Sequence, residues 1–112
     1  MKKGFAIAIL LLFGLTFMGQ IRQIYYPWGE LEFHVNALNM GTKHQDDLHI
    51  SVYMPSLGIY TVSSPFDLND GHKTSKFISV YAPEAKGNAY IARFVLSNDN
   101  VRDVRYVWAN FY

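Results

Sequence analysis

The stretch DLHISVYM, Asp47–Met54, decides the fold class of this chain. Its side chains alternate: Leu48, Ile50, Val52 and Met54 fall on one side of an extended chain, and His49, Ser51 and Tyr53 fall on the other. Successive residues of a strand point to opposite faces of a sheet, so the alternation predicts a strand with one buried apolar face.

The same period of two recurs from Gly29 onward. The clearest segments are ELEFHVNAL at 30–38, KFISVYA at 76–82, AYIARFVLS at 89–97 and RDVRYVWANFY at 102–112, with short pieces near 59–62 and 66–68. Turn-forming residues separate them: Pro55 and Gly58, Ser63-Ser64-Pro65, Asp70-Gly71, Pro83 to Gly87, and Asn98-Asp99-Asn100. Turn signals at intervals of about eight to twelve residues predict an all-β antiparallel sandwich of about seven strands over residues 29–112.

The last predicted strand carries apolar side chains on both faces. Tyr106 and Trp108 share one face, and Val107, Ala109 and Phe111 share the other. A strand of this kind is either covered on both sides or meets a partner, so we expect one face to fill the core and the other to pack on a neighbouring subunit or on the N-terminal segment. Trp108 and Phe111 are therefore candidate interaction residues. The predicted core includes Leu31, Phe33, Val35, Leu48, Ile50, Val52, Phe94, Leu96, Tyr106 and Trp108.

The segment APEAKGNAY, 82–90, carries a Pro, a Gly four residues further on, and a Tyr that opens a long alternating strand. It resembles the approach to the penultimate strand of immunoglobulin-like and fibronectin-like domains, in which the Tyr closes a corner by hydrogen-bonding back to the chain. This resemblance implies structural roles for Pro83, Gly87 and Tyr90.

The resemblance extends to PFDLNDGHKTSKFISVYAPEA, 65–85, and to SNDNVRDVRYVW, 97–108. Residues 47–108 are similar to immunoglobulin-like modules of archaeal and bacterial cell-surface proteins, of the CARDB and NEW3 type. The similarity implies a display or adhesion role, with other cell-surface proteins or copies of the chain itself as partners.

The N-terminal stretch KKGFAIAILLLFGLTFMGQ, 2–20, places two lysines before a run without charge from Gly4 to Gly19. This is the layout of an export signal, and it predicts a hydrophobic helix over residues 1–19. Three interpretations stay open: a cleaved signal peptide, a retained membrane anchor, or a helix kept after cleavage at Gly4, because KKGF resembles the leader of type IV pilin-like proteins. Each predicts that residues 20–112 are extracellular or at the cell surface.

The connector over residues 20–28 is too apolar for a solvated linker, because it carries Tyr25, Tyr26 and Trp28. If the leader is cleaved, we expect the connector to add to the edge of a sheet. If the leader is retained, the same aromatic residues would lie at the membrane interface. In both cases these three residues are candidate interaction residues.

Composition excludes several classes of function. The chain has 112 residues, enough for one domain. Residues 20–112 hold eight Lys or Arg and nine Asp or Glu, a net charge of −1, so no basic field is present to bind nucleic acid. The sequence has no Cys, which excludes disulfides and thiolate chemistry.

Two segments hold candidate metal ligands. They are His44, Asp46, Asp47 and His49 in HQDDLH, 44–49, and Asp67, Asn69 and Asp70 in DLNDGHK, 67–73. Imidazole with carboxylate suits zinc or a similar ion, and the oxygen ligands of the second segment suit calcium. Solvated turns are the alternative interpretation, and Asp70-Gly71 fits a tight hairpin turn.

The sequence holds no nucleophile elbow, no glycine-rich phosphate loop and no recognisable acid–base pair, so it predicts no catalytic residues and no cofactor. We expect a non-enzymatic, exported cell-surface module with a structural or adhesive role. The alternatives are a pilin-like filament subunit and, third, a small metal-binding or hydrolytic extracellular protein. Membrane contact through the N-terminal helix is expected only if that helix is retained.

Overall fold

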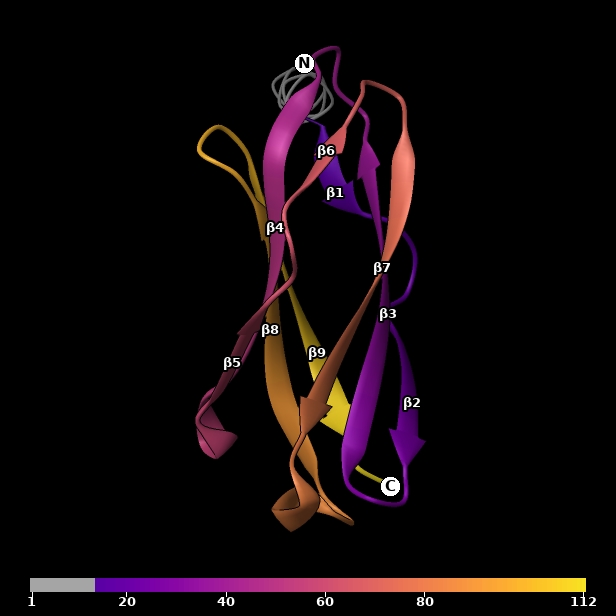
Figure 1. The fold of residues 1–112 in the computed structure, drawn as a ribbon, viewed down its shortest axis with the longest axis vertical. Helices are drawn as coiled ribbons and strands as arrows, with labels where there is room; N and C mark the ends of the chain where they lie inside the picture. The colour runs from indigo at the N-terminus through magenta and orange to yellow at the C-terminus, as the bar shows by residue number, and fades with distance from the viewer. Residues whose placement is uncertain (1–13) are drawn as a thin grey trace, which may run out of the picture.

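The computed structural model describes residues 14–112, which fold into nine strands and two short 3₁₀ helices (Figure 1). The strands are β1 (Leu15–Phe17), β2 (Arg22–Tyr26), β3 (Glu30–Asn39), β4 (Gln45–Met54), β5 (Ile59–Val62), β6 (Phe66–Leu68), β7 (Lys73–Tyr81), β8 (Ala89–Ser97) and β9 (Arg102–Asn110), and the helices are η1 (Pro55–Leu57) and η2 (Pro83–Ala85). They form two packed antiparallel sheets. The prediction of an all-β antiparallel sandwich is confirmed, with nine strands in place of seven.

The predicted N-terminal helix is wrong for the part of it that the structure describes. Leu15–Phe17 forms strand β1, in which Leu15 and Phe17 are buried between the sheets. Residues 1–13 of the predicted helix lie outside the described residues. Within residues 14–112, no helix is long and apolar enough to cross a membrane.

The first sheet has four strands and is built around β3. β7 pairs with β3 from Leu38↔Lys73 to Glu30↔Tyr81. β1 and β2 pair with two successive parts of the other edge of β3, both antiparallel to it. They therefore act as one edge strand that is interrupted at residues 18–21, and the predicted connector forms the second half of that strand.

The second sheet has five strands, in the order β5-β4-β8-β9, with β6 also paired to β4. Figure 1 shows β4 and β8 on one side of the molecule and β3 and β7 on the other. The register between β4 and β6 shifts between Gln45 and Leu48. Asp47 lies inside this irregularity with φ 54°, a left-handed conformation that Asp tolerates better than most residues.

The core lies between the two sheets and follows the alternation of the sequence. Leu31, Phe33, Val35, Leu48, Ile50, Val52, Phe94 and Leu96 are all buried, as predicted. Phe33 and Phe94 face each other across the sheets with ring centroids 4.9 Å apart. An edge-to-face aromatic pair of this kind adds to the stabilisation from apolar burial.

The prediction for the last strand is wrong about which face is buried. Tyr106 and Trp108 are 64% and 61% exposed, whereas Ala109 and Phe111 are fully buried. Both faces of this segment are apolar, so the alternation identified which residues share a face without deciding which face meets the core. Phe111 is consequently a core residue and is excluded as an interaction residue.

Side chains join the interrupted edge strand to the free edge of β9. The Phe17 N–H donates to the Asp103 carboxylate at 2.9 Å, and the Arg105 guanidinium donates to the Phe17 carbonyl at 3.1 Å. Further along, Gln23 donates through Nε2 to the Trp108 carbonyl and accepts through Oε1 from the Asn110 N–H, at 2.7 and 2.9 Å. We call these hydrogen bonds the seam between β1, β2 and β9. The seam covers the edge of β9, which could otherwise pair with another chain.

Candidate functional site

The outer face of the five-stranded sheet carries a row of long side chains across four strands. Tyr60 of β5 is opposite Tyr53 of β4, Tyr53 is opposite Arg93 of β8, and Arg93 is opposite Tyr106 of β9. Neighbouring strands lie about 4.8 Å apart, so the row is about 14 Å long. Tyr60 is 65% exposed, and Tyr53 is 42% exposed.

Apolar side chains surround this row on the same face. Val62, Val104 and Trp108 are exposed and lie two residues along their strands from a member of the row. We call the set Tyr53, Tyr60, Val62, Arg93, Val104, Tyr106 and Trp108 the tyrosine face. Contiguous exposed apolar patches of this kind mark interaction surfaces in soluble proteins.

Arg93 is the cation at the centre of the tyrosine face. Its Nε is shielded from solvent and has no hydrogen-bond partner among the residues that the structure describes. Within residues 14–112, both ion pairs involve a histidine, so no carboxylate neutralises Arg93. In the register Arg93 lies between Tyr53 and Tyr106, and a guanidinium can stack on aromatic rings and donate hydrogen bonds to a partner.

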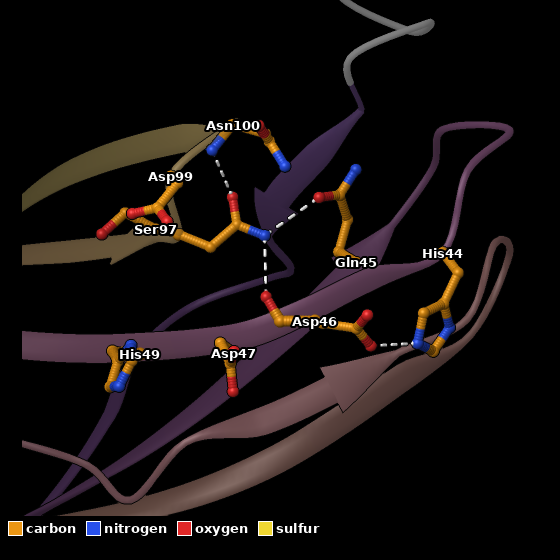
Figure 2. A pocket seen from close by; sticks show the side chains of 9 residues that line it. His44, Gln45, Asp46, Asp47, His49, Ser97, Asp99 and Asn100 are labelled. Atoms are coloured by element: carbon orange, nitrogen blue, oxygen red, sulfur yellow. Dashed lines mark hydrogen bonds and ion pairs between the residues drawn. The ribbon is translucent and has the colours of Figure 1, made fainter.

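A second surface, a polar depression of about 550 Å³, lies where the start of β4 meets the β8–β9 loop (Figure 2). Its lining residues are His44, Gln45, Asp46, Asp47, His49, Ser97, Asn98, Asp99 and Asn100. Asn98 donates through Nδ2 to Gln45 Oε1 and to the Asp46 carbonyl, at 3.0 and 2.9 Å. Its Oδ1 accepts from the N–H groups of Asn100 and Val101. Asn98 therefore holds the loop in place and has no spare capacity for a ligand.

His44 joins two loops beside this depression. One ring nitrogen, Nδ1, contacts Asn69 Oδ1, and the other, Nε2, contacts Asp46 Oδ1. Both acceptors are satisfied when the ring is doubly protonated and donates from each nitrogen. The hydrogen bond to Asn69, then the hydrogen bond and negative charge of Asp46, raise the pKa of His44 above its ordinary value of 6.5.

We expect the thermal stability of the sandwich to fall as pH rises through the folded-state pKa of His44. Because this pKa is higher in the folded chain than in the unfolded one, the stabilisation is fully present below pH 6.5 and is lost above the raised value. Melting temperatures across this range, with an NMR titration of the imidazole, check the prediction. His44→Gln should remove this part of the pH dependence, and the exposed His72→Gln should not. A wild-type slope in the His44 variant would contradict it.

The structure brings members of the two predicted metal sites together. His44, Asp46 and Asp67 each offer a ligand atom within 4.8 Å of the others, and Asn69 joins them through His44. A metal requires a neutral histidine with a free ring nitrogen. Here both nitrogens are engaged, so a metal that bound through His44 would have to displace Asn69 or Asp46 from the ring.

The side chains of the remaining metal candidates are not part of this cluster. Figure 2 shows Asp46 turned toward His44, with His49 further along β4. The backbone N–H of Asp47 donates to Asp67 Oδ1 at 3.1 Å, which fixes the irregular start of β4. Asp70 stands in the turn before β7, where Gly71 has φ 74° and donates to the Asn39 carbonyl at 2.7 Å.

The structure gives Tyr90 a packing role, and the expected corner hydrogen bond stays a prediction. Its ring meets Phe111 edge to face at 6.2 Å. Pro83 opens η2, and Gly87, with φ 83°, donates to the Phe111 carbonyl at 2.8 Å. The turn between β7 and β8 is therefore held by backbone bonds and by the buried Phe111.

The aromatic residues of the connector divide between core and surface. Tyr25 packs edge to face on Phe111 at 6.4 Å. Tyr26 stacks on Trp28 at 4.8 Å, and Trp28, which is 59% exposed, donates from Nε1 to Glu30 at 3.1 Å. Tyr26 and Trp28 thus lie on the outside of the four-stranded sheet, whereas Tyr25 belongs inside.

Sequence reasoning missed Tyr53, Tyr60 and Arg93 as surface residues that lie in one row. The signal was available in part, since each occupies the polar side of an alternating strand. Their alignment depends on the registers of β5, β4 and β8, which one strand alone does not reveal. Comparison of the chain with models of known protein families and with curated proteins finds no match.

Proposed function

We propose that this chain is an exported, non-enzymatic cell-surface module of the immunoglobulin-like type, which binds a partner protein through its tyrosine face. The observation that carries the proposal is the row from Tyr60 through Arg93 to Tyr106, which is exposed on a regular sheet and is not covered by any other described part of the chain. Export is expected from the apolar N-terminal run that follows two lysines.

The strand order supports the immunoglobulin-like part of the proposal. β3 pairs with β7 in one sheet, and β4, β8 and β9 follow one another in the other. Immunoglobulin-like domains distribute their second and fifth strands, and their third, sixth and seventh strands, in the same way. β5 adds to the outside of β4, which widens the second sheet on the side of Tyr60.

The residue types of the tyrosine face support a binding role. Tyrosine, tryptophan and arginine dominate the energetically important positions of protein interfaces, because each buries a large area and offers a polar group. Tyrosine has few rotatable bonds, so its immobilisation on binding costs little conformational entropy. Arg93, held between Tyr53 and Tyr106, supplies the charge that orients an acidic partner.

The proposal is tested in intact cells of the source organism with the tagged full-length chain. Protease added outside the cells should digest the protein, and the Tyr60→Ser/Tyr106→Ser variant should lose at least about tenfold in its affinity for the cell envelope, because each side chain is an interface anchor. Tyr112→Ser, which changes a residue that is 70% exposed outside the face, is the matched control. Protection from the added protease, or unchanged retention of the double variant, would overturn the proposal.

A further inference from the structure

The two lateral sides of the sandwich differ in how their edges are closed. On one side, the seam joins β1 and β2 to β9 through hydrogen bonds. On the other side, the edge strands are β7 in the first sheet and the short β5 and β6 in the second. β7 pairs with β3 over its whole length, and within residues 14–112 no strand pairs with its other edge. β7 therefore presents a long row of backbone groups that another strand can reach.

The second half of β7 has the composition of a segment that pairs readily with a copy of itself. Residues 77–81, FISVY, hold no charge, Gly or Pro, and all of them except Ser79 are aromatic or β-branched. Short segments with high β propensity and low charge form interchain strands when they are exposed at the edge of a sheet. The charges of β7 lie before this segment, at Lys73 and Lys76.

Lys76 lies on the side of β7 that faces the core. It is opposite Val35 of β3, which is buried, and directly opposite residues of an antiparallel pair share a face. Lys76 therefore belongs to the row that the buried Ile78 and Val80 continue. Its side chain is half-buried, and its Nζ lies 4.8 Å from the centre of the Phe66 ring of β6. The ammonium group thus stands between the two edge strands, over an aromatic ring.

We infer that β7 is an edge to which a second copy of this chain can add its own β7, and that Lys76 prevents this pairing. Two β7 strands in full antiparallel overlap place residue 73 opposite 81, and residue 76 opposite 78 of the other copy. The two Lys76 side chains then lie on the same inner face as diagonal neighbours, about 7–8 Å apart at the backbone. The inference concerns the edge of the sheet and does not rest on the proposed function.

Two effects of Lys76 oppose the pairing. A second copy that adds to β7 turns its own open side toward this one, so each ammonium group loses water. Within residues 14–112 Lys76 forms no ion pair that would compensate this loss, and burial of an unpaired charge is costly. The two like charges also repel each other. An inward-pointing charge on an edge strand is one of the ways in which β-sheet proteins avoid association.

The experiment compares Lys76→Met with wild type in the purified full-length chain, held in a mild detergent so that the apolar N-terminal run affects every variant equally. Methionine keeps a long apolar side chain and removes only the charge. Wild type should sediment as a monomer. Lys76→Met should form a dimer, with a dissociation constant at least about tenfold below the lower limit for wild type. Association should stop at the dimer, because pairing of β7 with β7 is isologous.

Hydrogen–deuterium exchange locates the contact. The amides of residues 73–81 should exchange more slowly in the Lys76→Met dimer than in the wild-type monomer. Lys73→Met is the matched control, because it removes the same charge from an exposed position of the same strand, on the outer face. Lys73→Met and the charge-preserving Lys76→Arg should both stay monomeric. Lys76→Gln, a milder change, should dimerise in the same way, and circular dichroism confirms that each variant is folded.

Several results would overturn the inference. They are a wild type that already pairs through β7, a Lys76→Met protein that stays monomeric, a dimer whose β7 amides are not protected, and equal association of Lys73→Met. The Tyr60→Ser/Tyr106→Ser change, added to Lys76→Met, should leave the dimer intact, because Tyr60 and Tyr106 belong to the other sheet. The outcome for β7 is therefore distinct from the outcome for the proposed function.

Discussion

Deletion of residues 1–19 is expected to destabilise the sandwich by several kcal/mol more than deletion of residues 1–13. The longer deletion removes β1, whose Leu15 and Phe17 are 7% and 3% exposed. Phe17 meets Phe94 edge to face at 6.4 Å, and loss of a buried phenylalanine side chain costs about 3–5 kcal/mol. The deletion also leaves the Asp103 carboxylate and the Arg105 guanidinium without their partners on β1.

Urea unfolding of the two deletion proteins checks this prediction. Phe17→Ala in the full-length chain should reproduce most of the difference, and Phe77→Ala, at a residue that is 68% exposed, should have little effect. Equal unfolding midpoints for the two deletions would show that β1 adds nothing to the fold. The result bears on the leader, because a mature chain that begins at Gln20 lacks a strand of the core.

Gly29→Ala is expected to cost about 3 kcal/mol or more, from a left-handed backbone and a forced shift of neighbouring atoms. Gly29 has φ 96°, and a Cβ built there would lie 2.6 Å from Pro83 Cα and 2.9 Å from Pro83 N. The obstacle is backbone, which has no rotamer to change. The Gly29 carbonyl also accepts from the Ala82 N–H at 2.9 Å, so a shift of η2 breaks this bond as well.

Gly58→Ala is the matched control for this change. Gly58 also has a left-handed backbone, with φ 63°, but its added Cβ would meet no atom within 4 Å. It should cost only about 1 kcal/mol, the conformational part of the effect. Equilibrium denaturation of both variants measures the difference, and a Gly29 variant no less stable than the Gly58 variant would contradict the close contact with Pro83.

Alternation predicted β3, β4 and β8 well because each has one apolar and one mixed face. Phe33, Ile50 and Phe94 lie on the apolar face of their strands, and this face is buried in the fold. The observed burial therefore agrees with the period of two in the sequence. The last strand offered no such contrast, and the assignment of Tyr106 and Trp108 to the core failed for that reason. The short β1 could not be recognised because it lies in a run that is apolar on every side. In such a run a strand shows no alternation of apolar and polar residues.

The candidate surfaces depend on contacts between segments that are far apart in the chain, and the sequence alone does not reveal these contacts. His44 and Asn69 are 25 residues apart and meet only because β6 pairs with the irregular start of β4. Some residues of each predicted metal site thus belong to a single cluster. Likewise, the tyrosine face exists because three separate registers place Tyr60, Arg93 and Tyr106 in one line.

The seam between β1 and β9 determines how the sandwich transmits a mechanical load. β1 lies toward one end of the long axis, and the chain ends at Tyr112 toward the other (Figure 1). A pull between these points draws β1 along β3 and β9 along β8, parallel to the strands, so the hydrogen bonds of each pair resist together and do not open one by one. The bonds from Asp103 and Arg105 to Phe17 couple the two terminal strands directly. Tension therefore passes between β1 and β9 through these side-chain bonds as well as through the strand pairs.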